Sequence, residues 1–227
     1  MQRLGPLHPG TLVDADWFAT RERAPHAAPH VEICMITTPD GATALDGRSG
    51  PLGGPPDQEM LRAWRRRCDI VLVGAGTARA EKYGPPSREG LRIAVVTRTC
   101  NLDYSSPLFA SGRGIVVTTT DAPDVPVESV RAGFGEVDLA AAIGSLGARV
   151  VHVEGGPALN ASLLAADLVD AINLTFSPRL GGAHTGDAIA TAFNGSRRFV
   201  LVDAAREGDF VYARYERPRR RCGVRTS

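Results

Sequence analysis

The sequence predicts an α/β protein with a largely parallel central sheet that helices cover on both faces. Along most of the 227 residues, short apolar runs typical of buried strands alternate with segments of helical periodicity. Two of these runs lead straight into a glycine-bearing turn that opens a helix. The last two runs flank the turn-forming residues 206–209 and predict an antiparallel hairpin at the sheet edge.

The first predicted strand follows an N-terminal arm. Residues 1–30 show no sustained periodicity, and only 14–18 suggest a short helix, so we expect an arm that packs on the domain. The apolar run 31–36 predicts a strand, which the turn residues Pro39-Asp40-Gly41 bring to an end.

A helix is expected after the glycine- and proline-rich loop 47–56. Asp57 is a good N-cap residue, and apolar side chains then recur at helical spacing: Met60, Leu61, Trp64 and Cys68. The other side of this helix carries arginines, which we interpret as a solvated face: Arg62, Arg65 and Arg66.

The remaining elements alternate as expected of a parallel sheet. Strands are predicted at 70–73, 92–97, 114–118, 149–153 and 171–176, and hairpin strands at 199–204 and 210–215. Helices are predicted at 137–146 and from 157 to about 166. Because there is no internal repeat or linker, we expect one domain over 31–216, between the arm and a tail at 217–227.

Charge and composition exclude several classes of function. The net charge is only +1, and five arginines lie in the tail, which we expect to be a disordered end. A nucleic-acid partner is not expected, because it needs a concentrated basic surface. No apolar run is long enough for a signal peptide or a membrane span, so we expect a cytoplasmic protein without a membrane partner. Cysteines 34, 68, 100 and 222 form no C-x-x-C pair and are expected to be free thiols.

Two strand-to-helix turns carry the pattern of an anion-binding site. They are Gly74-Ala75-Gly76-Thr77 and Glu154-Gly155-Gly156-Pro157. Glycines let backbone N–H groups approach a phosphate, and a helix N-terminus adds positive partial charge. Both turns follow parallel strands, so we expect them at one edge of the sheet, where a dinucleotide could span them. The alternative is that the glycines only make tight connections.

Several better-known motifs are absent from the sequence. The third glycine of the Rossmann fingerprint is replaced by Arg79, and Lys82 has no P-loop around it. His30-Val31-Glu32 resembles part of a zinc-deaminase motif, but the required Pro-Cys-x-x-Cys is missing. We therefore expect no bound metal.

Three charged residues near predicted strand ends are candidates for ligand contacts. Arg98 has a planar fork suited to a phosphate, including the 2′-phosphate of NADPH, or it is a solvated strand-end arginine. Asp40 and Glu154 are the best carboxylates for orienting or protonating a substrate. Either carboxylate could instead cap a turn.

Three ordered blocks of the chain resemble the pyrimidine reductase family of riboflavin biosynthesis. Thr38-Pro39-Asp40-Gly41 is similar to the family's Ser-x-Asp-Gly motif, and residues 69–79 are similar to its second block. Glu154-Gly155-Gly156-Pro157, with 168–170 and 177–182 after it, resembles the third. The match covers about residues 29–215.

The resemblance implies a dihydrofolate-reductase-like fold, NADPH as hydride donor and a homodimer. Family members reduce the ribosylamino group of a phosphoribosylaminopyrimidine, so the implied activity is that of a 5-amino-6-(5-phosphoribosylamino)uracil reductase. By position, Asp40 and Glu154 are the expected catalytic residues, and Thr38 also faces the substrate. The expected cofactor contacts are Gly74, Gly76, Thr77, Glu81, Thr97, Arg98, Gly155 and Gly156.

One segment departs from the family pattern and leaves two alternatives open. Bifunctional members have an Asp-Asp-Pro segment followed by a substrate-contacting arginine, where this chain has residues Glu81-Lys82-Tyr83-Gly84-Pro85-Pro86. The first alternative is a paralogue that reduces dihydrofolate or another pterin-like or pyrimidine-like metabolite. The second is an NADPH-binding regulatory subunit without turnover.

Overall fold

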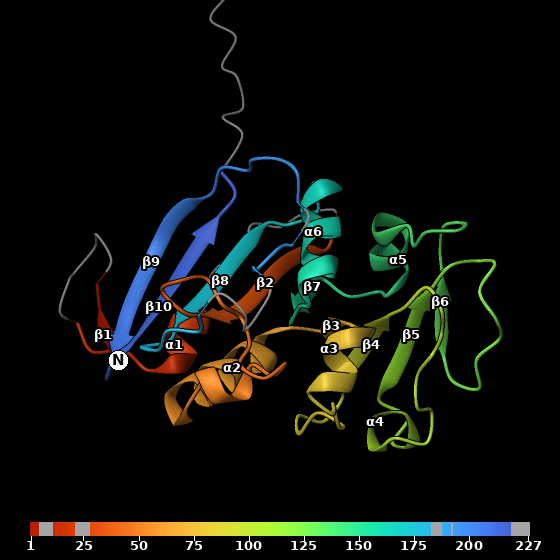
Figure 1. Cartoon of the computed structure of the whole chain (residues 1–227), viewed down its shortest axis with the longest axis horizontal. Coiled ribbons are helices and arrows are strands. Elements are labelled where there is room, and N and C mark those ends of the chain that lie inside the picture. Colours follow the sequence, from red (N-terminus) through yellow and green to blue (C-terminus); the bar gives the residue numbers. More distant parts are fainter. Residues whose placement is uncertain (5–10, 21–27, 183–187, 192, 219–227) are drawn as a thin grey trace, which may run out of the picture.

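A single large sheet runs through the computed structural model, which describes residues 1–4, 11–20, 28–182, 188–191 and 193–218. Within these residues the sheet has ten strands in the order β1-β9-β10-β8-β2-β7-β3-β4-β5-β6 (Figure 1). The strands are β1 (Gln2–Arg3), β2 (His30–Thr37), β3 (Ile70–Gly74), β4 (Arg92–Val96), β5 (Gly114–Thr118), β6 (Ser129–Arg131), β7 (Val150–Val153), β8 (Ala171–Phe176), β9 (Val200–Glu207) and β10 (Phe210–Glu216).

The sheet has a parallel part and an antiparallel edge, as the sequence predicts. Every pairing from β8 through β2, β7, β3, β4 and β5 to β6 is parallel. The hairpin β9–β10 joins antiparallel to β8, and β1 extends the edge by pairing with β9. The carboxyl ends of the parallel strands therefore share one side of the sheet, where ligands collect in open α/β folds.

Helices cover both faces of the sheet. In Figure 1, α5 and α6 lie above it and α2, α3 and α4 lie below. Alternating side chains explain the two layers: Ile70 and Leu72 pack into the core beneath α5 and α6, while Val71 and Val73 pack toward α3 and α4. The helices are α1 (Ala15–Ala19), α2 (Pro55–Arg67), α3 (Ala75–Ala80), α4 (Pro107–Ala110), α5 (Leu139–Ser145) and α6 (Pro157–Ala165), with a 3₁₀ turn η1 (Gly50–Leu52). In the described parts of the chain, no helix has the length and apolar character needed to cross a membrane.

The differences from the predicted elements are small and have physical reasons. Asp57 does not cap α2, because Gly54 occupies the N-cap and Pro55 and Pro56 fill the first helical positions. The strands β1 and β6 and the helix α4 were not predicted, since two to four residues are too few for periodicity to show.

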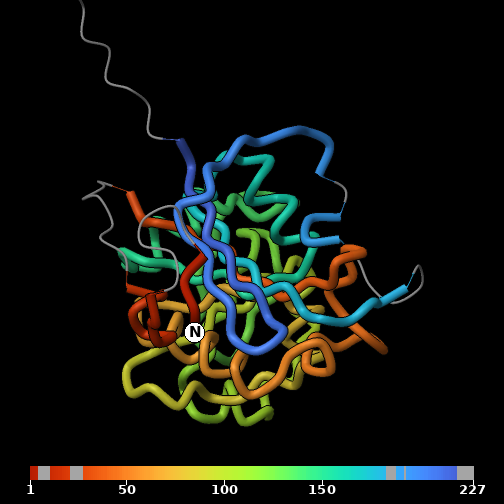
Figure 2. Tube along the Cα trace, turned by 90° about the vertical axis from the view of Figure 1, so that its left-hand side faces the viewer, coloured from red at the N-terminus to blue at the C-terminus, as the bar shows by residue number. Residues whose placement is uncertain are grey.

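The N-terminal residues pack against the hairpin. Gln2 and Arg3 pair with β9, and the buried Arg3 side chain forms a salt bridge of 3.0 Å with Asp203. Figure 2 looks onto this edge, where the N-terminus lies beside the hairpin. The division into arm, domain and tail stays a prediction, and most of the tail, 219–227, lies outside the described residues.

A buried ionic cluster joins the hairpin to the centre of the sheet. Arg214 is fully buried, and its Nη1 lies 2.6 Å from Glu32 Oε2 and 2.9 Å from Asn173 Oδ1. Its guanidinium also lies 5.3 Å from the centroid of the Trp64 ring of α2. A buried charge is tolerated only when it is paired, so these side chains fix where β2, β8, β10 and α2 meet.

Removing the partner of Arg214 should destabilise the fold strongly. We expect Glu32→Ala to lower the free energy of unfolding by about 3–5 kcal/mol, because Arg214 is left buried without its nearest carboxylate. Denaturant unfolding measures the loss. Glu59→Ala is the matched control, since Glu59 pairs with Arg62 and Arg66 on the exposed face of α2 and its loss should change stability little. Equal effects of the two substitutions would contradict this account.

Candidate active site

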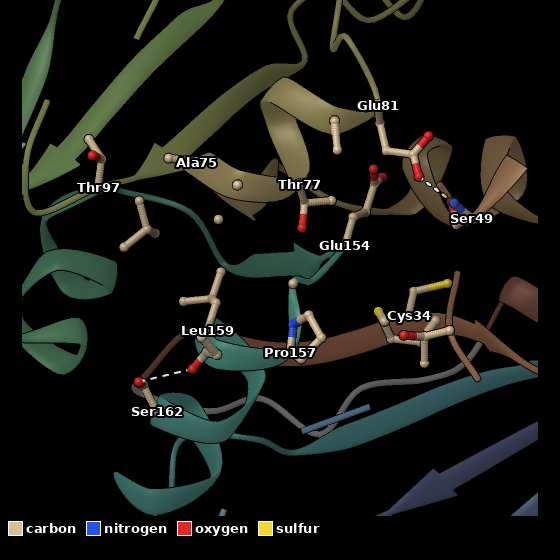
Figure 3. Close-up of a pocket in the computed structure, with 18 of the residues that line it drawn as sticks. Cys34, Ser49, Ala75, Thr77, Glu81, Thr97, Glu154, Pro157, Leu159 and Ser162 are labelled. Carbon is tan, nitrogen blue, oxygen red and sulfur yellow. Dashed lines mark hydrogen bonds between the residues drawn. The ribbon is translucent and has the colours of Figure 1, made fainter. Parts of the chain in front are cut away.

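A cavity of about 1160 Å³ opens at the carboxyl ends of the central parallel strands. Its walls come from β2, the β3–α3 turn, the end of β4, the β7–α6 turn, the first turn of α5 and one side of α2. Figure 3 shows Thr77, Glu154 and Pro157 around the same space, with Cys34 toward one end and Thr97 toward the other. The volume is large enough for an extended cofactor and a small substrate together.

The two glycine turns meet in this cavity. The N–H of Gly74 donates to the carbonyl of Gly155 at 2.7 Å, so the prediction that both turns lie at one edge is confirmed. Gly155 has a φ of +88°, which favours glycine, and a Cβ on Gly156 would lie only 2.5 Å from Thr77 Oγ1. A Cβ on Gly76, by contrast, would meet nothing within 4 Å, and this residue lines the cavity. The turns therefore bring backbone to the cavity wall and keep side chains out of it.

Glu154 occupies the centre of the cavity wall and is almost completely buried. Arg65 of α2 donates to both carboxylate oxygens, from Nε at 2.7 Å and from Nη2 at 2.6 Å. The hydroxyl of Tyr83 donates to Oε2 at 2.6 Å, and His152 Nε2 lies 3.6 Å from Oε1. This ring of partners compensates the loss of water around the carboxylate.

The partners of Glu154 keep it ionised. Burial by itself would raise the pKa of Glu154, but the hydrogen bonds and positive charge of Arg65 outweigh it, and the net effect is a lowered pKa. Burial and the neighbouring Glu154 raise the pKa of Tyr83, which stays a neutral donor. The site thus holds an ionised carboxylate that is paired with the Arg65 guanidinium at neutral pH.

The prediction that all three arginines of α2 face solvent is wrong for Arg65. We predicted a solvated arginine face, but Arg65 is largely buried and pairs with Glu154, while Arg62 and Arg66 do face solvent. The signal was present in the sequence: Leu61, Arg65 and Cys68 follow one another at steps of four and three, so they share one stripe of the helix. A single charge within an apolar stripe points to a buried partner.

Asp40 and Thr38 lie outside the residues that line the cavity. The Thr38 hydroxyl donates to Asp40 Oδ1 at 2.5 Å, and the N–H groups of Gly181 and Gly182 donate to the same carboxylate at 3.1 and 2.8 Å. These hydrogen bonds lower the pKa of Asp40 to about 2. Asp40 therefore holds the end of β2 beside residues 181–182 as an ionised carboxylate, and its catalytic role stays a prediction.

The expected cofactor residues come together around the cavity. Gly155 is buried beneath the wall, and the others line it: Gly74, Gly76, Thr77, Glu81, Thr97, Arg98 and Gly156. Arg98 is exposed at the rim, where it can reach a ligand. Glu81 accepts a hydrogen bond of 2.5 Å from the N–H of Ser49, so it also ties the loop before α2 to α3 (Figure 3).

Two further polar residues of the cavity were not predicted as site residues. Asp57, in the first turn of α2, and Thr175, on β8, both line the cavity. Burial raises the pKa of Asp57, and the Thr175 hydroxyl partly offsets this. The helix-capping pattern around Asp57 hid its role, because an aspartate before an apolar periodic stretch is usually a cap.

Metal ligation and disulfide formation both depend on how the described histidine, cysteine and carboxylate side chains are grouped. No group of three histidine, cysteine or carboxylate side chains that could hold a metal occurs among the described residues. Cys34, Cys68 and Cys100 are free thiols, and Cys222 lies outside the described residues. Burial raises the pKa of Cys34, which lines the cavity.

Fold and cavity together define a dihydrofolate-reductase-like α/β protein. A crystal structure of a pyrimidine reductase-like protein from Corynebacterium diphtheriae superposes with a TM-score of 0.77 at 23% identity, over 90% of this chain and 98% of that one. Dihydrofolate reductase from Enterococcus faecalis superposes with a TM-score of 0.52 at 12% identity, over 83% and 96%. The predicted fold class is confirmed.

The sequence comparisons identify the family. The family profile of the RibD C-terminal domain matches residues 29–198, so the chain belongs to this family, and the resemblance found in the sequence is confirmed. A relative from Methanothermobacter thermautotrophicus is 26% identical over 78% of this chain and 89% of its own length. That protein is named 2,5-diamino-6-ribosylamino-4(3H)-pyrimidinone 5′-phosphate reductase.

Glu154 contributes to the free energy of unfolding in a way that depends on pH, and loss of Arg65 should reverse the direction of that dependence. In the wild type the pKa of Glu154 is below its usual 4.5, so this stabilisation is present above about pH 4.5 and is lost as the pH falls further. In Arg65→Gln, burial raises the pKa instead, so the free energy of unfolding should fall as the pH rises from 5 to 8. At pH 7 we expect a loss of about 3–5 kcal/mol.

Denaturant unfolding at pH 5, 6, 7 and 8 measures this effect. Arg62→Gln is the matched control, because Arg62 lies on the exposed face of the same helix and should leave the pH profile unchanged. A parallel profile for Arg65→Gln and the wild type would show that Arg65 does not set the charge of Glu154.

Proposed function

We propose that this protein is an NADPH-dependent reductase that converts the ribosylamino group of a phosphoribosylaminopyrimidine to a ribitylamino group. One observation carries the proposal: two glycine turns meet beside a buried, ionised carboxylate in a single cavity at the carboxyl edge of the sheet. Membership of the RibD C-terminal domain family and the reductase name of the archaeal relative support it.

The cofactor half of the cavity fits a dinucleotide phosphate. The glycines of both turns let backbone N–H groups approach a pyrophosphate, and Gly76 leaves the space that a side chain would fill. Thr77 and Thr97 offer hydroxyl donors, and Arg98 offers a cation at the rim for the 2′-phosphate. When bound, NADPH supplies a hydride; the protein's task is to place it beside the substrate.

Glu154 acts on the substrate half through its charge. The substrate accepts a hydride at C1 of its ribose once the sugar ring has opened to a protonated imine, and the ring oxygen takes a proton as the ring opens. The positive charge at the imine faces a carboxylate that Arg65 and Tyr83 keep ionised and oriented. Since Glu154 is held ionised, we assign it a positioning role and leave the balancing proton to solvent. Asp40 would act through the end of β2 and residues 181–182, which its carboxylate holds together.

The cytoplasmic location and the homodimer belong to the same proposal and are supported by family membership. Light scattering of the purified protein tests the dimer. A regulatory subunit without turnover is the competing function, and it would bind NADPH but oxidise it with none of the candidate substrates.

The proposed activity is tested by NADPH absorbance. Turnover of 2,5-diamino-6-ribosylamino-4(3H)-pyrimidinone 5′-phosphate, its deaminated uracil counterpart and dihydrofolate should be compared. Oxidation of NADPH with one of the two phosphoribosylaminopyrimidines supports the proposal. Oxidation with dihydrofolate alone identifies the paralogue instead, and tight NADPH binding without any oxidation favours the regulatory subunit.

Arg98 should set the preference for NADPH over NADH. We expect Arg98→Gln to weaken NADPH binding about 10- to 100-fold, because a charge-assisted hydrogen bond to the 2′-phosphate is lost. NADH binding should stay the same, since NADH lacks that phosphate. Cofactor fluorescence titration measures both constants, and an equal loss for the two cofactors would remove Arg98 from this role.

A side chain at position 76 should block the cofactor without harming the fold. Gly76→Val places methyl groups where nothing lies within 4 Å, so the change should lower NADPH affinity at least 10-fold while the melting temperature is kept. Gly144→Val is the matched control, because Gly144 is also helical with open space around it but lies outside the cavity lining. Unchanged affinity in Gly76→Val would place the cofactor elsewhere.

A further inference from the structure

We propose that the phenolic oxygen of Tyr83 accepts a hydrogen bond from the N–H of the protonated imine that receives the hydride. Tyr83 is then a catalytic residue, and Glu154 acts through it by holding the proton of its hydroxyl. This inference rests on the proposed function and names the atom that meets the reacting group.

The end of α3 fixes the position of Tyr83. The helix closes with a Schellman motif, in which the N–H of Tyr83 donates to the carbonyl of Ala78 at 3.0 Å and the N–H of Lys82 donates to that of Arg79 at 3.2 Å. Lys82 has the left-handed φ of +52° that this motif needs. The Tyr83 ring packs against the buried cluster that contains Ala78, an apolar contact that often accompanies the motif. Local backbone geometry therefore places this tyrosine, in a segment that departs from the family pattern.

The proton of the Tyr83 hydroxyl is committed to Glu154. The hydroxyl donates to Oε2 at 2.6 Å, and Glu154 stays ionised because Arg65 outweighs its burial and lowers its pKa. Burial and the charge of Glu154 raise the pKa of Tyr83, so the phenol keeps its proton at neutral pH. A hydroxyl has one proton to donate and two lone pairs that accept. Tyr83 lines the cavity, and it can offer a ligand only an acceptor.

Glu154 itself has little capacity left for a substrate. Oε2 accepts from Arg65 Nη2 and from Tyr83, while Oε1 accepts from Arg65 Nε and has His152 Nε2 3.6 Å away. Only 4% of the Glu154 side chain is exposed, and its pairing with Arg65 leaves little net charge to attract a cation. Within the described residues no group donates to the Tyr83 oxygen. The open acceptor at this point of the wall is therefore the phenolic oxygen.

The chemistry of the imine matches such an acceptor. As the hydride adds to C1, the π electrons of the C=N bond move to nitrogen, and the cation becomes a neutral amine. Compared with the closed, neutral sugar, the imine and the transition state both carry positive charge, so an acceptor at the N–H lowers the barrier. A hydroxyl that donates to an ionised carboxylate is polarised and accepts more strongly. Glu154 directly precedes the turn expected to hold the cofactor, so the Tyr83 hydroxyl lies where hydride and imine would meet.

Removal of the phenolic oxygen should slow the reaction. We expect Tyr83→Phe to lower kcat/KM for the phosphoribosylaminopyrimidine about 10- to 100-fold, because a hydrogen bond to a charged group is lost. NADPH affinity should stay the same, which also shows that the variant is folded. Tyr104→Phe is the matched control, since the Tyr104 hydroxyl donates to the carbonyl of Cys100 at 2.7 Å outside the cavity lining. Its kcat/KM should equal that of the wild type, and an equally active Tyr83→Phe would overturn the inference.

Site-specific incorporation of 3-fluorotyrosine at position 83 separates direct contact from a role in orienting Glu154. Fluorine withdraws electrons from the ring, so the hydroxyl donates more strongly to Glu154 while its oxygen accepts more weakly. If the oxygen contacts the imine, kcat/KM should fall about 3-fold although the hydrogen bond to Glu154 is kept. If Tyr83 only orients Glu154, kcat/KM should be unchanged or higher, and that result would remove Tyr83 from the reacting group.

A binding measurement makes the test independent of turnover. An amidinium analogue of the opened substrate carries an amino group on C1 and keeps a cationic N–H, whereas the corresponding amide has a neutral one. Calorimetric titration with saturating NADPH should show that the wild type binds the amidinium about 10- to 100-fold more tightly than the amide. Tyr83→Phe should lose this preference, and Tyr104→Phe should keep it.

The outcomes separate this inference from the proposed function. An amidinium preference that survives in Tyr83→Phe overturns the inference and leaves the reductase standing. If NADPH is not oxidised with any substrate, the proposed function fails, and the amidinium and amide affinities of the wild type and Tyr83→Phe still decide whether this oxygen accepts from a cation. Equal affinity of the wild type for the two analogues also contradicts the role of Tyr83.

Discussion

A carboxylate withdrawn from water at the end of β7 sets the architecture of the site. Glu154 can be buried only because Arg65 from α2 and Tyr83 from the segment after α3 reach it. Those contacts fix α2 against the carboxyl edge of the sheet and close the wall between the two halves of the cavity. The proposed chemistry uses the same carboxylate, oriented by the same two partners, so in this proposal one pairing serves both structure and function.

The core behind Glu154 extends this constraint across the molecule. His152 stacks on Trp64 with ring centroids 6.5 Å apart, and the guanidinium of Arg214 lies 5.3 Å from the centroid of the same ring. Arg214 in turn pairs with Glu32 on the central strand β2. Trp64 therefore contacts both a neighbour of Glu154 and the buried Arg214–Glu32 pair. This arrangement couples the hairpin edge of the sheet to the cavity through Trp64 and Arg65 of α2.

Much of the fold and of the cofactor half could be predicted from the sequence, because both depend on local patterns. The apolar runs that begin at Ile70 and Val150 predict buried strands, and the glycines after them predict two turns at one edge of the sheet. The hydrogen bond between Gly74 and Gly155 confirms that these turns lie side by side. The substrate half depends on contacts between distant residues, which leave no local pattern. Arg65 pairs across 89 positions with Glu154, and Asp57 carries the pattern of a helix cap while facing the cavity. The motif around Asp40 resembles that of the family, and its carboxylate accepts hydrogen bonds from the backbone N–H groups of Gly181 and Gly182, so its catalytic role stays a prediction.

The central claim is that the two glycine turns hold the cofactor so that its reactive ring lies beside Glu154. The structure of a complex with NADPH tests this claim most directly. The account predicts the pyrophosphate at the turn Gly74-Ala75-Gly76-Thr77, the 2′-phosphate within reach of Arg98, and the nicotinamide next to Gly156 and Glu154. A cofactor bound outside this cavity, or with its adenine rather than its nicotinamide beside Glu154, would contradict the account.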